Sequence, residues 1–382
     1  MKICQVTLNK NDFTAKDLDV LQSEQPQWIT VFGHTSYFER GDLGIRLKAI
    51  FPNAEIIGCS TAGEIANDGV YDNKLIVTGV KLKHPNLKAT WCEVNGAADS
   101  RNSGKNLTKQ FSKSDLSAVF VLSQGVNVNG SDLIAGMKEN LNNETIITGG
   151  LAGDSGSFKK TYVVCNEKVG SNITAGIAFY GKSLKITTGS MGGWEPFGPV
   201  RRVTKSKANI LYTLDGEPAL ELYKKYLGEH AKNLPASGLF FPFAILKENG
   251  DQTGLIRTVL AINENDGSLI SAGDIPENSI IRLMTGKTAN LVKGATDAAH
   301  SAVAGMNGIK VEDSFAILVS CVGRKLVMAD DTDDEVEAVQ ALMPKTAVTG
   351  FYSYGEICPY GFVSDCKLHN QTMTISYFSE ID

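Results

Sequence analysis

The segments IIGCSTAGE (56–64), IITGGLAGD (146–154) and VTGFYSYGE (348–356) decide the fold, because they repeat one pattern three times. Each begins with apolar and β-branched residues, which are typical of a buried strand, and runs into a glycine-containing loop. In each, the last glycine is followed by a carboxylate. A pattern that recurs in this much detail predicts an internal structural repeat.

The same elements surround each of these segments. An apolar strand and an amphipathic helix precede the glycine loop, and a strand that opens with Asn follows it. The sequence places the first strands at 28–32, 118–122 and 315–319, the helices at 43–50, 132–141 and from 330–334 onward, and the last strands at 73–77, 172–176 and 370–374. A strand, a crossover helix and a second strand favour parallel pairing.

A different kind of sequence lies between the second and third repeats. Strand-like stretches at 239–241, 254–262 and 279–284 are separated by turn residues and predict an antiparallel meander. A helix with an apolar stripe is expected over 288–306. We therefore predict an α/β fold of mixed sheets with flanking helices, built from repeated β-loop-α-β units.

Length and composition bound the class of protein. The chain has 382 residues, more than one hydrophobic core usually serves, so two lobes are expected, 1–214 and 215–382. The net charge is -5 without a clustered Lys/Arg stripe, which argues against nucleic acid and anionic membranes as partners. The start MKICQVTLNK lacks the apolar core of a signal peptide, and no apolar run is long enough to span a bilayer. We expect a cytoplasmic protein with reduced cysteines and no membrane insertion.

The glycine loops are the candidate binding site. Loops beyond the carboxyl ends of parallel strands bind ligands in open α/β sheets, and glycines there let backbone N–H groups approach a ligand closely. The predicted ligand-binding residues are Ser60, Thr61, Gly63, Glu64, Gly150, Gly153, Asp154, Arg324, Tyr352, Ser353, Gly355 and Glu356. The alternative is that the glycines serve tight turns and the carboxylates cap adjacent backbone.

Several of these segments together resemble the FIST family. They are IIGCSTAGEI (56–65), GGLAGD (149–154), LDGEPALELYKKYLG (214–228), CVGRK (321–325), FYSYGEI (351–357) and LHNQTMTI (368–375). The resemblance spans an N-terminal segment of about 28–203 and a C-terminal one of about 218–360. It implies a bacterial sensor that binds a small ligand and regulates a separate sensor histidine kinase or a cyclic-di-GMP enzyme. A chain without a fused output domain looks like the haem-binding, nitric-oxide-sensing FIST proteins.

Three hypotheses for function follow. In the first, haem is the cofactor and His300 or His230 is the iron ligand, with nitric oxide sensed at the open side. In the second, the protein senses an amino acid or similar polar metabolite without haem, and Arg324 grips its carboxylate in bidentate fashion. The third is an enzyme that uses Glu64 or Glu356 as general base and Cys59 or Ser60 as nucleophile.

The sequence favours a sensor over an enzyme. It contains no complete P-loop, no dinucleotide-binding glycine fingerprint and no two-histidine zinc motif. The sequence is compatible with a homo-oligomer of identical chains.

Overall fold

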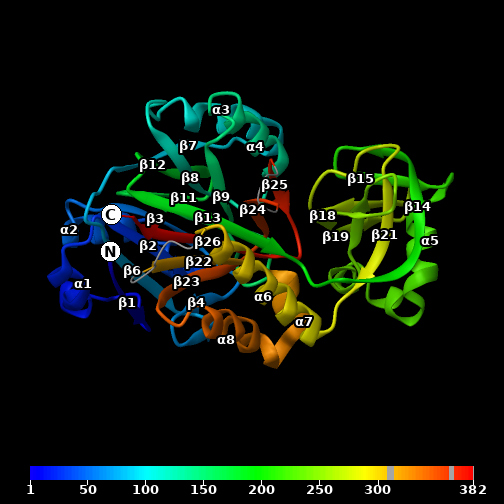
Figure 1. The fold of residues 1–382 in the computed structure, drawn as a ribbon. Coiled ribbons are helices and arrows are strands. Elements are labelled where there is room, and N and C mark those ends of the chain that lie inside the picture. Colours follow the sequence, from blue (N-terminus) through cyan, green and yellow to red (C-terminus); the bar gives the residue numbers. More distant parts are fainter. Residues whose placement is uncertain (308–313, 361–364, 382) are drawn as a thin grey trace.

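A strand-helix-strand unit occurs three times in the computed structural model, which describes residues 1–307, 314–360 and 365–381 (Figure 1). The first unit is β2 (Trp28–Gly33), α2 (Leu43–Ile50) and β3 (Glu55–Ser60), and the second is β8 (Leu116–Ser123), α4 (Gly130–Lys138) and β9 (Ile146–Leu151). The third is β22 (Ser314–Cys321), α7 (Val322–Met328), α8 (Thr332–Leu342) and β23 (Thr346–Ser353). The two strands of each unit pair in parallel, which confirms the predicted repeat.

Two more strands complete each unit. The predicted last strands are β6 (Leu75–Lys81), β12 (Ile173–Tyr180) and β26 (Met373–Glu380). Each pairs antiparallel with the first strand of its unit and with a leading strand that was not predicted from the sequence. These leading strands are β1 (Lys2–Leu8), β7 (Leu87–Glu93) and β13 (Leu184–Met191).

The three units are interlocked by exchanged hairpins. After its glycine loop, each unit sends a short strand to the sheet of another unit: β4 pairs with β23, β24 with β9, and β10 with β3. The hairpins are β4 (Glu64–Ala66) with β5 (Gly69–Tyr71), β10 (Val163–Cys165) with β11 (Lys168–Gly170), and β24 (Gly355–Pro359) with β25 (Cys366–His369). The exchange closes a ring of three six-stranded sheets. The carboxylate of each loop therefore lies where the chain passes from one sheet to the next.

Aromatic side chains from all three sheets fill the space between them. The indole of Trp28 lies 5.0 to 5.3 Å, centroid to centroid, from the rings of Phe179, Phe315 and Phe378. These contacts are edge-to-face, which is favourable for aromatic quadrupoles. Because each sheet supplies part of this cluster, the three units share one core.

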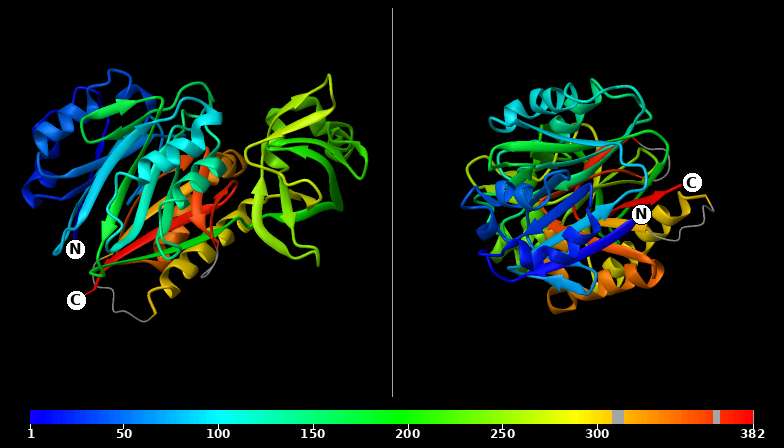
Figure 2. Two further views of the ribbon diagram at one scale, coloured as in Figure 1. Left: turned by 90° about the horizontal axis from the view of Figure 1, so that it is seen from above. Right: turned by 90° about the vertical axis from the view of Figure 1, so that its left-hand side faces the viewer.

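Helices cover the outer faces of the three sheets (Figure 2). The remaining helices of this body are α1 (Asp19–Glu24), α3 (Ser100–Thr108) and α6 (Thr288–Ala304), and α6 confirms the helix predicted over 288–306. Short 3-10 turns lie at Ala15–Leu18, Thr35–Tyr37, Ala97–Asp99 and Ala329–Asp331. In the described part of the chain, no helix combines the length and the apolarity that crossing a membrane would require.

A smaller lobe is inserted between β13 and α6, beside the body (Figures 1 and 2). Its strands are β14 (Glu195–Lys207), β15 (Ile210–Leu214), β16 (Glu217–Pro218), β17 (Phe243–Leu246), β18 (Gln252–Arg257), β19 (Val259–Asn263), β20 (Ser268–Ser271) and β21 (Ile280–Thr285). Its helices are α5 (Ala219–Leu227), η4 (Gly228–Asn233) and η5 (Ala236–Phe240).

All strands of the small lobe pair antiparallel in one sheet, as the predicted meander requires. The stretch 239–241 is an exception, because it ends a short helix instead of forming a strand. The predicted division after residue 214 falls at the end of β15, inside this sheet.

Candidate functional site

Glu64 is a buried carboxylate that holds its own crossover loop together. Its Oε1 accepts a hydrogen bond of 2.5 Å from the hydroxyl of Thr61, and its Oε2 accepts one of 3.0 Å from the backbone N–H of Lys74. Burial raises the pKa of Glu64 to about 7, although these two hydrogen bonds act in the opposite direction. The carboxyl group thus ties the start of β4 to the segment that leads into β6.

Glu356 occupies the equivalent position in the third unit. Its Oε1 accepts from the hydroxyl of Ser353 at 2.7 Å, and its Oε2 accepts from the backbone N–H and hydroxyl of Thr372 at 3.2 and 2.9 Å. The side chain is fully buried, and this burial raises its pKa to about 8. In both units, a hydroxyl three residues earlier and a backbone N–H before the last strand satisfy the carboxyl group.

Asp154, the carboxylate of the second unit, organises a longer loop. It accepts the backbone N–H groups of Phe158, Lys159 and Lys160 at 2.7 to 2.8 Å, and it also accepts the hydroxyl of Tyr354. These contacts fix the loop over 155–160, in which Phe158 has a φ of +53°. A bulky side chain rarely adopts this left-handed conformation, so the surrounding bonds must hold it there.

The three glycine loops meet, and backbone groups take part in the contacts between them. The hydroxyl of Ser60 donates to the carbonyl of Gly153 at 2.7 Å, and the N–H of Gly153 donates back to the carbonyl of Ser60 at 2.9 Å. The N–H of Tyr352 donates to the carbonyl of Gly63 at 2.8 Å. A Cβ on Gly153 would lie 2.6 Å from the backbone nitrogen of Ala62, so glycine is required by close packing here.

Gly150 and Gly355 serve strand pairing. They lie in β9 and β24, the two strands that the exchanged hairpin brings together. A Cβ on Gly150 would lie 2.7 Å from a methyl group of Val319. These glycines therefore allow close approach of protein to protein.

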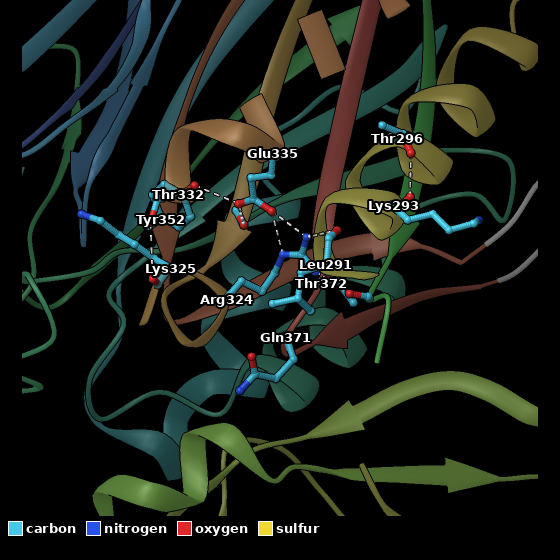
Figure 3. A network of polar contacts seen from close by, with 12 residues as sticks. Leu291, Lys293, Thr296, Arg324, Lys325, Thr332, Glu335, Tyr352, Gln371 and Thr372 are labelled. Carbon is cyan, nitrogen blue, oxygen red and sulfur yellow. Dashed lines mark hydrogen bonds and ion pairs between the residues drawn. The ribbon is translucent and has the colours of Figure 1, made fainter. Parts of the chain in front are cut away.

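Arg324 faces the interior and is fully engaged there (Figure 3). Its Nε and Nη2 donate to Oε2 of Glu335 at 3.1 and 2.6 Å, and Nη1 and Nη2 also donate to the carbonyls of Gly192 and Leu291. Tyr352 adds a hydrogen bond from its hydroxyl to the other carboxylate oxygen of Glu335 at 2.8 Å. Both of these nitrogens donate to one oxygen of Glu335, a carboxylate of this chain, and a bidentate contact of Arg324 with a ligand carboxylate stays a prediction.

The two candidate iron ligands lie at the surface. His300 is exposed on α6, and His230 is exposed in η4, with its ring 5.2 Å from that of Phe241. Among the described residues, no group of three or more His, Cys, Asp or Glu side chains is placed to hold a metal ion. Among the histidines that the structure describes, only His369 is fully buried; its Nε2 lies 2.9 Å from the carbonyl of Cys358, and burial lowers its pKa to about 4.

A cleft of about 630 Å³ lies between the body and the small lobe. The residues that line it are 125–128, Leu151, Gly156, Phe158 and Tyr354 from the body, and Asn209, 233–236, Leu239, 259–260 and 271–272 from the lobe. Most of them are apolar, and among these described residues none carries a charge. Phe158 stacks on Tyr354 with ring centroids 4.1 Å apart, and this pair forms an aromatic wall.

Most of the body side of the cleft is built by the second unit, and Tyr354, between β23 and β24, comes from the third. Residues 125–128 follow β8 and residues 156–158 follow β9, so they lie at the carboxyl ends of the parallel pair. The sequence predicted ligand-binding loops at such strand ends, and in this unit the loops do line a cleft. None of the twelve predicted ligand-binding residues lines it, and their assignment as ligand contacts stays a prediction.

The body residues of the cleft that were not predicted from the sequence lie within a few positions of residues that were predicted. Phe158 is four residues after Asp154, and Tyr354 directly follows Ser353. The lobe residues lie outside the three repeats, so the repeat pattern could not predict that they line the cleft. An available signal was the Phe158–Lys159–Lys160 sequence after the loop, which differs from the other two units.

Comparison with known proteins agrees with the resemblance noted in the sequence. The family model of the FIST N domain matches residues 27–217, and that of the FIST C domain matches residues 219–359. The uncharacterized protein MJ1623 of Methanocaldococcus jannaschii is 26% identical over 196 residues, which cover 47% of this chain and 36% of that relative's length. A crystal structure of cyanuric acid hydrolase from A. caulinodans aligns with a TM-score of 0.40 and 7% identity, over 99% of this chain and 98% of that one.

Proposed function

The chain belongs to the FIST family, whose domains are generally signal-transduction sensor domains that bind small ligands, and we propose that its ligand binds in the cleft between the body and the small lobe. The cleft carries this proposal. Its volume lies within the range of about 300 to 1,000 Å³ that is usual for small-molecule sites. Its wall is mainly apolar with a few amide groups, from Asn127, Asn209 and Asn233, as expected of a site that fixes the orientation of a ligand.

The position of the cleft supports a sensory role. A ligand that contacts both the body and the lobe favours the arrangement in which both sets of contacts are made. The lobe is joined to the body by two connections, after β13 and before α6, which allow the lobe to take more than one position relative to the body. A ligand bound in the cleft therefore changes how often each of these positions is occupied. We propose that a separate histidine kinase or cyclic-di-GMP enzyme reads this change, and the family resemblance is the support for that output.

The proposed ligand is not haem. The lining residues of the cleft include no His, Cys or Met, and the hydroxyl of Tyr354 is occupied by Asp154. His300 and His230 are exposed and lie outside this lining. The described residues of the cleft therefore do not fit a haem iron.

We also propose binding in preference to catalysis. Ser60 donates its hydroxyl hydrogen to the carbonyl of Gly153 and accepts the N–H of Tyr162 at 2.8 Å, so in the described part of the chain its hydrogen is held by a carbonyl instead of a general base. Burial raises the pKa of the Cys59 thiol well above its usual range, which disfavours the thiolate nucleophile.

Binding of the neutral dye N-phenyl-1-naphthylamine tests the cleft, because its fluorescence increases in apolar surroundings. Leu260 lines the cleft and is 40% exposed, whereas Leu326 on α7 is 44% exposed and lies outside it. We expect saturable dye binding that Leu260→Asp weakens about tenfold or more, since it places a charge against the apolar body of the dye. Leu326→Asp is the matched control and should bind as the wild type does. Equal binding by the two variants, or no saturable binding, would overturn the proposal.

A visible absorption spectrum of the protein reconstituted with haem tests the alternative. A Soret band that is lost in His300→Ala or His230→Ala would replace the proposal with a haem site. We expect no such histidine-dependent band.

A further inference from the structure

A second hollow, polar in character, adjoins the cleft. It measures about 420 Å³ and shares Val126 and Asn127 with the lining of the cleft. Polar side chains that line it include Asn95, Gln124 and Asn172. The cleft and this polar hollow therefore meet along one stretch of backbone, at the end of β8.

Two lysines line the polar hollow without an acidic partner. Lys159 and Lys160 are both exposed, and within residues 1–307, 314–360 and 365–381 neither forms an ion pair. The ammonium group of Lys160 lies 5.1 Å from the ring centroid of Tyr162. No Asp or Glu is among the described lining residues of either hollow. The only charged side chains in these two described linings are therefore the lysines of the polar hollow, and their charge is positive.

Asp154 fixes how the lysines and the aromatic wall are arranged. Its two oxygens accept the backbone N–H groups of three successive residues, Phe158, Lys159 and Lys160. Phe158 lines the cleft, whereas Lys159 and Lys160 line the polar hollow. A single buried carboxylate, 6% exposed, thus sets an apolar surface and a cationic surface side by side.

Amide groups accompany the two cations. Gln124 is 5% exposed, and its Nε2 makes long contacts of 3.4 and 3.3 Å with the carbonyls of Val94 and Asn127. Asn172 stands just before β12 and lines the polar hollow. Lysine and amide N–H groups together are donors suited to a carboxylate or sulfonate oxygen.

We propose that the ligand of this protein is an amphipathic anion, whose aromatic or aliphatic body occupies the cleft and whose anionic group lies in the polar hollow between Lys159 and Lys160. This inference rests on the proposed function of the cleft and specifies the chemistry of its ligand. The ligand has an apolar part and an anionic part because the cleft has no charged side chain in its described lining, whereas the polar hollow has two lysines.

Two dyes with the same aromatic body separate the two parts of the site. 8-Anilino-1-naphthalenesulfonate carries a sulfonate that N-phenyl-1-naphthylamine lacks, and the fluorescence of both reports binding. We would titrate each dye into the wild type, the double variant Lys159→Met/Lys160→Met and the control Lys109→Met/Lys113→Met, at low and high salt. Lys109 and Lys113 are exposed lysines that follow α3 and lie outside both hollows.

We expect the double variant to weaken binding of the sulfonate dye about fivefold or more and to leave binding of the neutral dye unchanged. Added salt should lower the affinity of the wild type and of the control for the sulfonate dye, but it should not lower the affinity of the double variant. Unchanged binding of the neutral dye also shows that the double variant is folded.

The outcomes distinguish the inference from the proposed function. If the neutral dye binds in a Leu260-dependent manner but the lysine substitutions leave the sulfonate dye unaffected, the anionic assignment is wrong and the cleft proposal stands. If neither dye binds saturably, both are overturned.

Discussion

Arg324 and Glu335 form a fully buried ion pair in which Nη2 of the arginine lies 2.6 Å from Oε2 of the glutamate. The same guanidinium donates to the carbonyl of Gly192, just after β13, and to that of Leu291, in the first turn of α6. Gly192 lies in the connection from β13 to the small lobe, and Leu291 lies just beyond the other connection, at the start of α6. Arg324 thus ties the connection after β13 to the start of α6, and Figure 3 shows it beside Glu335 and Leu291.

Loss of one member of this pair should be costly. Arg324→Met leaves the carboxylate of Glu335 buried without its counter-charge, and it removes the donors to two carbonyls. We expect the free energy of unfolding to fall by about 3 to 5 kcal/mol, as is typical when a buried ion pair is broken. Urea denaturation followed by circular dichroism measures this change.

The exposed pair Lys293–Asp297 is the matched control for that measurement. Its side chains are 71% and 44% exposed and lie four residues apart on α6. Asp297→Asn should cost no more than about 0.5 kcal/mol. A similar small loss in Arg324→Met would show that the buried network contributes little to stability.

The repeated core could be predicted from the sequence because its signals are local. The apolar strands, the helices at 43–50 and 288–306 and the parallel pairs all depend on patterns within a few tens of residues. The exchanged hairpins depend on partners far away in the sequence, as in the pairing of Ile65 with Gly350. Three-residue strands such as β4 and β10 carry too little periodicity to reveal such partners.

The candidate site was predictable only in part, for a related reason. The sequence predicted a binding site in the glycine loops, and these loops do contact one another, as Ser60 contacts Gly153. It did not indicate that these loops fill the space between them with their own backbone. The cleft depends on how the inserted lobe lies against the second unit, and this is set by tertiary contacts without a local pattern.

Glu356→Gln tests the pH dependence of stability. The pKa of Glu356 is about 8 in the fold, above the value of about 4.3 for an exposed glutamate. Between these values the folded state binds more protons than the unfolded state, so the free energy of unfolding decreases as the pH rises. The stability from the neutral carboxyl group is complete below about pH 4.3 and is lost as the pH rises through about 8.

The variant should therefore show a shallower decline, by up to about 1.4 kcal/mol per pH unit, because Gln cannot ionise. Urea denaturation at a series of pH values from about 5 to about 8 gives the two slopes. Glu229, whose side chain is 87% exposed, supplies the control Glu229→Gln, which should keep the wild-type slope. Identical slopes in all three proteins would contradict the raised pKa.

Gly136→Ala should destabilise the protein although alanine is the better helix former. The substitution gains about 1 kcal/mol in helix propensity. A Cβ at Gly136 would lie 1.8 Å from the carbonyl oxygen of Arg101, so α3 and α4 must move apart. We expect a net loss of about 1 to 3 kcal/mol, measured by thermal or urea unfolding.

The control for that prediction is Asn106→Ala on the exposed side of α3. It adds the same helix former without an overlap, so it should leave stability unchanged or raise it slightly. If Gly136→Ala also leaves stability unchanged or raises it, the contact between α3 and α4 does not require a glycine at this position.

Asp154→Asn should loosen the loop over 155–160 that shapes both hollows. One carboxylate oxygen accepts the N–H groups of Lys159 and Lys160, and the other accepts those of Phe158 and the hydroxyl of Tyr354. In the variant, an NH2 group replaces one of the two carboxylate oxygens. This group is a donor, so the donors that the oxygen had accepted are left without a partner. The strained conformation of Phe158 then loses its support.

Limited digestion with trypsin detects this change, because Lys159 and Lys160 become cleavage sites when the loop opens. We expect cleavage there to be about tenfold faster in Asp154→Asn, since loss of these bonds favours local opening by about 1.4 kcal/mol. Asp99→Asn, which alters a loop that ends at α3, should leave cleavage at these lysines unchanged. If Asp154→Asn is cut no faster than the wild type, backbone packing alone holds the loop. The cationic and apolar surfaces would then not depend on this carboxylate for their arrangement.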